Sequence, residues 1–98
     1  MPKAYAIAHV TMINLEKFTE QYGSKVEETI KAFGGMFLVR GGDISYTEGE
    51  KLGDLNVVVE FPDITSALAW NNSDEYKAIL TGRTQNAKTN FIIIDGVA

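Results

Sequence analysis

The sequence predicts an α+β fold in which one four-stranded antiparallel sheet carries helices on one face. Two observations lead to this prediction. Segments with strand and helix periodicity follow one another in the order strand, helix, strand, strand, helix, strand, which is the split βαβ plan. The chain has 98 residues, which suffices for one domain and not for two. We therefore expect residues 1–98 to form a single domain.

Composition and charge exclude several classes of function. The chain is 45% hydrophobic and 22% charged with a net charge of −4, and no basic run is interleaved with aromatic residues. Nucleic-acid binding is therefore not expected. The absence of cysteine excludes disulfides, thiolate metal ligands and a Cys nucleophile. No segment reads as a signal peptide or approaches the ~18 apolar residues of a membrane span, so we predict a cytoplasmic protein that binds no membrane.

The first strand and helix follow from periodicity. Residues 5–12 alternate, with small apolar side chains at even positions, which suit packing under a helix, and larger ones, including His9, at odd positions. Asn14 is a favourable helix cap. An apolar stripe at gaps of three or four then predicts a helix through Leu15, Phe18, Tyr22, Val26, Ile30 and Phe33. Gly23 should weaken or kink this helix, and Gly34-Gly35 should end it.

The central part of the chain is predicted to pair as a hairpin. Met36–Arg40 is a second strand, which the segment Gly41-Gly42-Asp43 interrupts by a bulge or a bend. Residues 44–47 could continue the strand. Residues 48–54 contain two glycines and form the polar loop, and Leu55–Phe61 is the third strand.

The last part of the chain is predicted to be helical and then extended. Asp63 caps a second helix, which breaks at residues 71–73, and Ser73 or Asp74 caps a further helical stretch. Gly82 should limit or kink that stretch. Residues 90–95 form the last strand. The complete order is that of a ferredoxin-like βαββαβ fold.

Three strands are apolar on both faces, which is not typical of an antiparallel sheet with one face in water. The runs are Phe37-Leu38-Val39, Val57-Val58-Val59 and Ile92-Ile93-Ile94. Two helical regions cover only one face, and 98 residues leave no third layer. We therefore predict a homodimer in which two sheets face each other as a dimeric α+β barrel. The alternative is a monomer that exposes a few Val and Ile side chains.

Stretches along nearly the whole chain carry a resemblance to a known family. They are Ala4-Tyr5-Ala6-Ile7-Ala8, Gly34-Gly35, Phe37-Leu38-Val39-Arg40-Gly41-Gly42, Glu48-Gly49, Val58-Val59-Glu60-Phe61-Pro62-Asp63, Ala67, Ala69-Trp70, Ser73-Asp74-Glu75-Tyr76 and Arg83. On these residues the chain resembles the bacterial domain-of-unknown-function family thirteen-thirty, in the dimeric alpha-beta barrel superfamily. The resemblance implies the fold and the dimer. The superfamily includes cofactor-independent monooxygenases, muconolactone isomerases, haem-degrading proteins and chlorite dismutase-like proteins, so fold alone does not give the function.

His9 and Tyr5 are candidate site residues on the odd face of the first strand. His9 is the only side chain whose ordinary pKa lies near neutrality, so it is the candidate general base. The alternative is a His that is hydrogen-bonded for structural reasons. Tyr5 could donate a hydrogen bond to a ligand oxygen, or its ring could fill the dimer interface.

Arg40 and Gly41 are candidates for binding a carboxylate. The guanidinium of Arg40 at a strand end offers a planar pair of donors, and Gly41 lets a ligand approach the backbone closely. The alternative is a salt bridge between Arg40 and Glu60 on the adjoining strand.

Trp70, Tyr76 and Arg83 are candidates from the second helical region. Trp70 and Tyr76 could wall a pocket and Arg83 could supply a cation. The alternative is that the two aromatic residues are packing anchors and that Arg83 caps a helix or pairs with an acid.

The sequence has no phosphate-binding glycine loop before a helix and no nucleophile-elbow serine. The first hypothesis is a cofactor-independent enzyme or binder of a small, partly apolar organic acid. It would be held by Arg40 or Arg83 between the sheet and the helices or near the dimer interface. The second is a non-catalytic dimeric scaffold, regulatory partner or ligand sensor. Haem or metal handling is a third and weaker reading, since His9 alone offers a ligand. We expect no cofactor and no metal.

Overall fold

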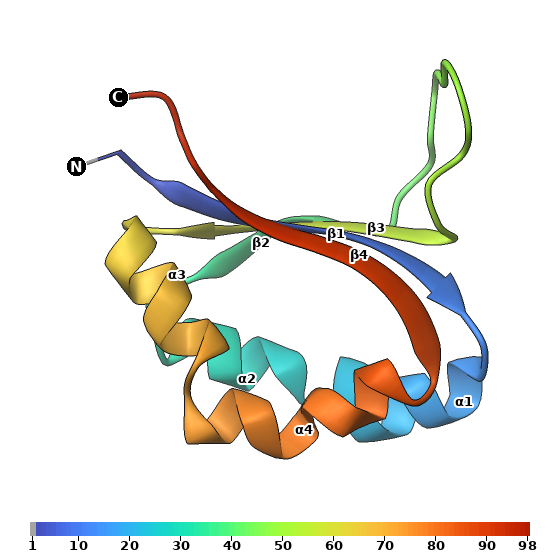
Figure 1. Ribbon diagram of the computed structural model, residues 1–98, viewed down its shortest axis with the longest axis horizontal. Helices are drawn as coiled ribbons and strands as arrows, with labels where there is room; N and C mark the ends of the chain where they lie inside the picture. The colour runs from blue at the N-terminus through green and yellow to red at the C-terminus, as the bar shows by residue number, and fades with distance from the viewer. Residues whose placement is uncertain (1) are drawn as a thin grey trace.

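One antiparallel sheet organises the chain, which a computed structural model describes over residues 2–98 (Figure 1). The strands are β1 (Ala4–Met12), β2 (Met36–Arg40), β3 (Leu55–Phe61) and β4 (Ala87–Asp95). They lie in the order β2-β3-β1-β4, and every neighbouring pair is antiparallel. This arrangement confirms the predicted ferredoxin-like α+β fold.

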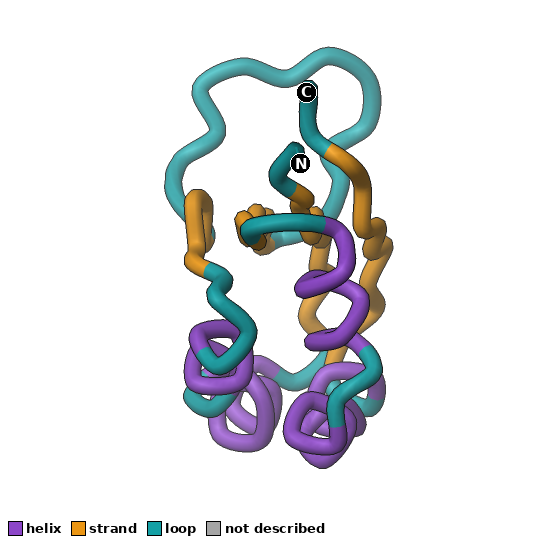
Figure 2. The backbone as a smooth tube through the Cα atoms, turned by 90° about the vertical axis from the view of Figure 1, so that its left-hand side faces the viewer, coloured by secondary structure: helices purple, strands orange, loops and turns teal. Residues whose placement is uncertain are grey.

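The helices form a second layer on one face of the sheet, while the segment between β2 and β3 projects from the other face (Figures 1 and 2). They are α1 (Leu15–Phe18), the π-helix η1 (Thr19–Gly23), α2 (Val26–Lys31), α3 (Ile64–Asn71) and α4 (Asp74–Thr84). Within residues 2–98 no helix has the length and apolar character needed to cross a membrane.

Three predicted caps begin helices. The side chain of Asn14 accepts a hydrogen bond from the backbone N–H of Lys17, and Ser73 accepts one from Tyr76. Asp63 accepts the N–H of Ser66 at 2.7 Å, and this hydrogen bond holds the pKa of the Asp63 carboxyl below its ordinary value.

The even face of β1 lies under the helices, as the alternation predicted. Ala4, Ala6, Ala8 and Val10 are all buried. Their small side chains let the helical layer approach the sheet closely. The largest fully buried side chains of the core are Trp70, Tyr76, Phe61 and Ile30.

The structure differs from prediction in the helical layer. The apolar stripe from residue 15 does not form one helix, because the chain widens into the π-helix η1 and turns at Ser24 and Lys25 before α2 begins. α4 runs through Gly82, which neither ends nor limits it. The backbone of Gly82 packs against η1, where an added Cβ would lie 2.7 Å from the carbonyl oxygen of Gln21.

The strands differ from prediction in two places. Residues 44–47 do not continue β2, because Gly41 and Gly42 take left-handed conformations (φ 77° and 87°) that turn the chain out of the sheet. The last strand begins at Ala87, three residues before the predicted start, and all of its residues pair with β1.

A bulge in β2 decides which face Arg40 occupies. Phe37 pairs with Val59, and Arg40 pairs with Val57. Two residues lie between Phe37 and Arg40 on β2, but only one lies between Val59 and Val57 on β3, so β2 contains one extra residue. Val57 and Val59 face the helices, and Phe37 and Arg40 therefore face them too. The predicted interruption at Gly41-Gly42-Asp43 is thus the end of the strand, and the bulge lies at Leu38.

In the part of the chain that the structure describes, the opposite face of the sheet carries no helix. Cross-strand partners place Val58, Ile7 and Ile92 in one row on it. The next row is polar and consists of Asn56, His9 and Asn90. Several large apolar side chains lie open on this side of the molecule, among them Ile92 and Ile94, which are 52% and 48% exposed.

Candidate functional site

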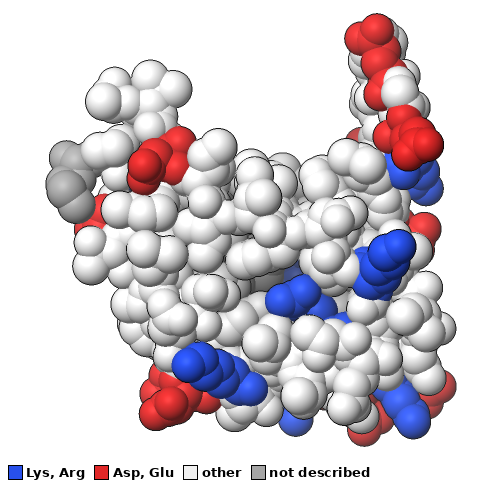
Figure 3. Space-filling model, viewed as in Figure 1, with Lys and Arg blue, Asp and Glu red and all other residues white. Residues whose placement is uncertain are grey.

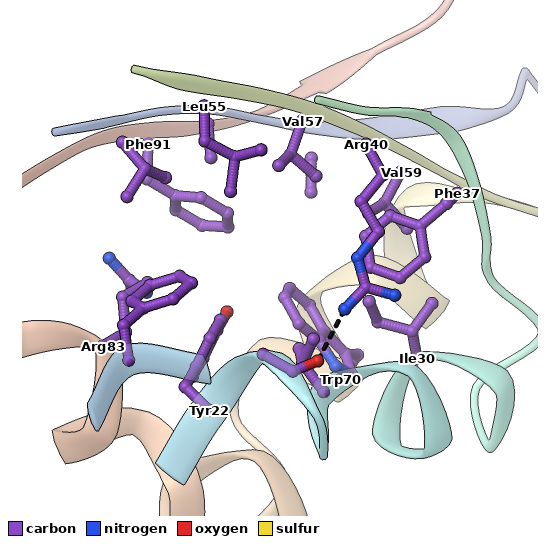
Figure 4. Close-up of a pocket in the computed structure, with 16 residues that line it drawn as sticks. Tyr22, Ile30, Phe37, Arg40, Leu55, Val57, Val59, Trp70, Arg83 and Phe91 are labelled. Carbon is purple, nitrogen blue, oxygen red and sulfur yellow. Dashed lines mark hydrogen bonds between the residues drawn. The ribbon is translucent and has the colours of Figure 1, made fainter. Parts of the chain in front are cut away.

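A small apolar cavity lies between the sheet and the helices (Figure 4). Its volume is about 70 Å³. Its walls come from all four strands, from α1, η1, α2 and α4, and from Trp70 near the end of α3. The lining residues are Ala6, Ala8, Val10, Phe18, Tyr22, Gly23, Val26, Ile30, Phe37, Arg40, Leu55, Val57, Val59, Trp70, Arg83 and Phe91.

Arg40 reaches the cavity from the edge strand β2, because the bulge turns it toward the helices. Its Nη2 donates a hydrogen bond of 2.5 Å to the backbone carbonyl of Gly23 at the end of η1. Its guanidinium carbon lies 4.4 Å from the centre of the Phe37 ring, within the range of a cation–π contact. The predicted alternative, a salt bridge to Glu60, is not formed, since Glu60 pairs with Lys3 at 3.4 Å.

Arg83 reaches the cavity from α4, and Figure 4 shows it on the side opposite Arg40. Its guanidinium carbon lies 5.5 Å from the Phe91 ring centre and 5.8 Å from that of Tyr22. Its Nη2 makes one long hydrogen bond of 3.5 Å to the Tyr76 hydroxyl. Its Nε is buried and has no hydrogen-bond partner within residues 2–98.

A pair of tyrosine hydroxyls lies beside Arg83. The hydroxyls of Tyr22 and Tyr76 share a hydrogen bond of 2.9 Å, and Figure 4 shows the Tyr22 hydroxyl directed into the cavity. Burial raises the pKa of Tyr22 well above its ordinary value, and the neighbouring Tyr76 adds to the shift. Tyr22 therefore stays protonated at neutral pH and acts as a hydrogen-bond donor or acceptor, not as a base.

The charge at this cavity has no counterion of its own. Over residues 2–98 the one ion pair is Lys3 with Glu60, so neither Arg40 nor Arg83 is paired with a carboxylate. A cation kept partly out of water without an anion is costly, and an anion bound beside it recovers that cost. The arrangement suits a molecule with an apolar body and one carboxylate.

A groove adjoins the cavity on the side of Arg40. It has a volume of about 640 Å³ and shares Phe18, Gly23, Arg40 and Leu55 with the cavity. Another hollow, with a Lys or Arg side chain in it, lies between the sheet and the helices on the face that β4 and α4 present to the viewer in Figure 3. The Arg40–Gly23 hydrogen bond lies where the cavity and the groove beside Arg40 meet, because both residues line both spaces.

Three of the residues predicted from the sequence meet at this cavity. Trp70, Arg40 and Arg83 all line it. The indole Nε1 of Trp70 donates to the Thr29 hydroxyl at 3.0 Å, which fixes the ring as one wall. Tyr76 is buried behind the wall, with its ring centre 4.1 Å from that of Trp70.

The other three predicted residues lie elsewhere. Tyr5 is on the opposite face of the sheet, where its hydroxyl donates to Glu60 at 3.3 Å. His9 and Gly41 line a separate hollow of about 380 Å³ under the segment that joins β2 and β3. His9 Nδ1 donates to Asn56 Oδ1 at 2.7 Å, since an amide oxygen only accepts, and this leaves Nε2 as an acceptor in the neutral ring. A proton transfer from His9 to a molecule in the apolar cavity would have to cross the sheet.

Sequence reasoning missed Tyr22, Phe37 and Phe91 as cavity residues. The available signal was Tyr22, the one position of the first apolar stripe that carries a hydroxyl. The chain from residue 2 to 98 contains no cluster of three or more His, Asp or Glu side chains that could hold a metal ion.

Comparisons with known proteins identify a family of unknown function and several solved structures with a similar fold. Residues 3–97 match the family model described as a domain of unknown function, DUF1330. No curated protein matches the chain. A protein of unknown function from Rhodopseudomonas palustris has a similar structure, with a TM-score of 0.74 at 13% identity, over 99% of this chain and 84% of that one.

Two further structures are informative. SnoaB, a cofactor-independent oxygenase from Streptomyces nogalater, aligns over 100% of this chain and 96% of its own with a TM-score of 0.64 and 8% identity. A Bacteroides fragilis protein described as dimeric, with a ferredoxin-like fold and unknown function, aligns over 96% of both chains with a TM-score of 0.56 and 12% identity. At these identities the likeness establishes the fold alone.

Proposed function

Since the chain belongs to the DUF1330 family, whose description names no activity, we propose a function from its own cavity: it binds a small aliphatic carboxylic acid between the sheet and the helices. The single observation that carries this proposal is the buried, unpartnered Nε of Arg83 at the wall of an apolar cavity. A ligand carboxylate beside Arg83 would accept that N–H and neutralise the charge. The Tyr22 and Tyr76 hydroxyl pair offers a further hydrogen bond at the same point.

The size of the cavity favours short chains. At about 70 Å³ it is roughly half of the ~150 Å³ cavity that admits benzene in an engineered protein. A short aliphatic tail such as that of propionate or butyrate suits this space, whereas an aromatic ring would require the walls to move.

The proposal is for binding and assigns no reaction. His9, the candidate base from the sequence, lies across the sheet from the cavity, and Tyr22 remains a neutral hydroxyl. The oxygenase SnoaB shares the fold at 8% identity, which carries no residue of its chemistry to this chain.

The single Trp gives a direct assay, because Trp70 lines the cavity. Purified protein is titrated with propionate, butyrate, hexanoate and benzoate, and with the alcohol that matches each acid. We expect saturable changes in fluorescence for the short acids and at least about tenfold weaker binding of the alcohols, because a hydrogen bond to a charged group contributes about 1.5–3 kcal/mol. Equal binding of acids and alcohols, or no saturable response to any acid, would refute the proposal.

Arg83→Met is the matched variant, since it keeps an apolar stem of similar length and removes the cation. It should remove the preference for acids and leave alcohol binding within about twofold. Lys31→Met is the control, because it loses the same charge from an exposed position on α2 that lines no cavity.

We also propose that a second copy of the chain covers the open sheet face, with the row Val58, Ile7 and Ile92 at the centre of the contact. The apolar character of that row and the dimer described for the Bacteroides fragilis protein support this. Light scattering should give a dimer mass for the wild type and for Ala78→Glu, which changes the exposed surface of α4, and a monomer mass for Ile92→Glu. A monomeric wild type at micromolar concentration contradicts the proposal. The single-domain organisation and the cytoplasmic location remain predictions.

A further inference from the structure

We infer that the acid of the proposed function is a short aliphatic dicarboxylate, with one carboxylate beside Arg83 and the other beside Arg40. The methylene chain between the two carboxylates lies in the apolar cavity. The proposed function supplies the first carboxylate, and this inference rests on it. What is added is the class of acid and the role of the second arginine.

The two arginines lie on opposite sides of the cavity. Both line it, Arg40 from the edge strand β2 and Arg83 from α4. Figure 4 shows them facing each other across a space that apolar and aromatic side chains of the sheet and the helices surround. An acid with a charge at one end can neutralise only one of these cations. An acid with a charge at each end can neutralise both.

A second carboxylate has room on the side of Arg40. There the cavity meets the groove of about 640 Å³, and Arg40 and Gly23 line both spaces. The second carboxylate therefore lies in the groove and takes up none of the cavity. The volume of about 70 Å³ has to hold only the methylene chain and the first carboxylate, which is the same requirement that a short monocarboxylic acid makes.

Arg40 is held in position and has donors left for an anion. Its hydrogen bond to the Gly23 carbonyl and its contact with the Phe37 ring, 4.4 Å from the guanidinium carbon, place the group where the cavity and the groove meet. A guanidinium has five N–H donors, and the bond to Gly23 uses one of them. Within residues 2–98 no carboxylate pairs with Arg40. A planar guanidinium held in this way is suited to a carboxylate.

The two ends of the acid should contribute unequally to the affinity. The first carboxylate meets the buried Nε of Arg83 and should supply most of it. Arg40 is exposed, and water and salt weaken an exposed ion pair. We therefore expect the second carboxylate to add about three- to fivefold in affinity at low ionic strength. Its larger effect should be on the length of acid that the protein selects.

The test compares each dicarboxylate with its own monoamide, which has nearly the same shape and a neutral end. Succinate, glutarate and adipate are titrated at neutral pH and matched ionic strength, with Trp70 fluorescence as the readout. One diacid should bind about three- to fivefold more tightly than its monoamide, and the other two should show a smaller gain, because the protein sets the separation of the two arginines. The gain should shrink between about 10 mM and about 1 M salt, where the Debye length falls from ~30 to ~3 Å.

Arg40→Met is the decisive variant, since it keeps an apolar stem and removes the second cation. In this variant the diacid and its monoamide should bind equally. Lys31→Met loses the same charge from an exposed position that lines no cavity, so it should keep the preference for the diacid. Arg83→Met should weaken the binding of butyrate and of the diacids alike. Unaltered Tm values would show that the variants stay folded.

The outcomes separate the two proposals. A preference for one diacid that is lost in Arg40→Met and kept in Lys31→Met supports the dicarboxylate. Equal binding of every diacid and its monoamide in the wild type overturns it without any variant, and so does a preference that Arg40→Met keeps or that both variants lose. If butyrate still binds and depends on Arg83, the proposed function stands in each of these cases. No saturable response to butyrate or to any diacid refutes both.

Discussion

The contact between α4 and η1 gives a prediction in which two opposing effects can be compared. In a helix interior, Gly→Ala ordinarily stabilises by about 1 kcal/mol, because Ala loses less backbone entropy on folding. At Gly82 the added Cβ would lie 2.7 Å from the Gln21 carbonyl oxygen and 2.8 Å from the Gln21 carbonyl carbon. These are backbone atoms and cannot rotate away, so the helices must separate, which costs typically about 1–3 kcal/mol and occasionally more.

Because the nearest atoms belong to the backbone, we expect a cost in the upper part of that range, about 2–3 kcal/mol. Less the gain of about 1 kcal/mol from the helix preference, Gly82→Ala should lose a net ~1–2 kcal/mol of unfolding free energy. For a chain of this length that lowers Tm by roughly 4–15 °C. Urea denaturation followed by Trp70 fluorescence measures the free energy, and thermal melting measures Tm.

Gly23→Ala is the matched control within the helical layer. The nearest atom to its added Cβ is in the Phe18 ring at 3.7 Å, an ordinary contact. This variant should gain about 0.5–1 kcal/mol. If Gly82→Ala proves as stable as the wild type or more stable, the close packing of α4 on η1 does not restrain the helices and the reasoning is wrong.

Two further predictions concern buried hydroxyl groups. Thr29→Val should cost about 1–3 kcal/mol of unfolding free energy, because it leaves the buried indole N–H of Trp70 without its 3.0 Å acceptor; Thr29→Ser, which keeps the hydroxyl, should lose clearly less, and equal losses in urea denaturation would contradict this account. Burial raises the pKa of Tyr22 in the folded state. The stabilisation by the protonated Tyr22 hydroxyl is therefore complete below about pH 10, the ordinary tyrosine pKa. It is lost as the pH rises above that value, because the unfolded chain then ionises more readily than the folded one. The Tm of the wild type should therefore fall more steeply between pH 9 and 11 than that of Tyr22→Phe, and parallel curves would show that Tyr22 does not resist ionisation.

The layers of the fold could be predicted because each rests on a local signal. The alternation in residues 5–12 placed Ala6, Ala8 and Val10 under the helices, and the caps at Asn14, Asp63 and Ser73 began helices as predicted. The same alternation also separates His9 and Tyr5 from the cavity, since odd positions of β1 face the other way. The hypothesis that His9 and Trp70 belong to one site was therefore inconsistent with the predicted alternation of β1.

The rest depended on tertiary contacts. The sequence marks Gly82 as a helix breaker, but its role is to admit the backbone of Gln21. The spacing of the apolar residues likewise gives no sign that residues 19–23 form a π-helix. The partners of Arg40 and Arg83 could not be read from the chain either, because acids such as Glu60 lie near in the sheet order but bind other residues.

The bulge at Leu38 has a consequence for comparing this chain with its relatives. Arg40 faces the cavity only because β2 carries one residue more than simple alternation requires between Phe37 and Arg40. A homologue shorter by one residue there could retain an arginine before its two glycines, yet present it on the far side of the sheet. An arginine at the same position of a sequence alignment is therefore not enough to infer that a homologue has the same site. The spacing from the preceding aromatic residue has to be conserved as well.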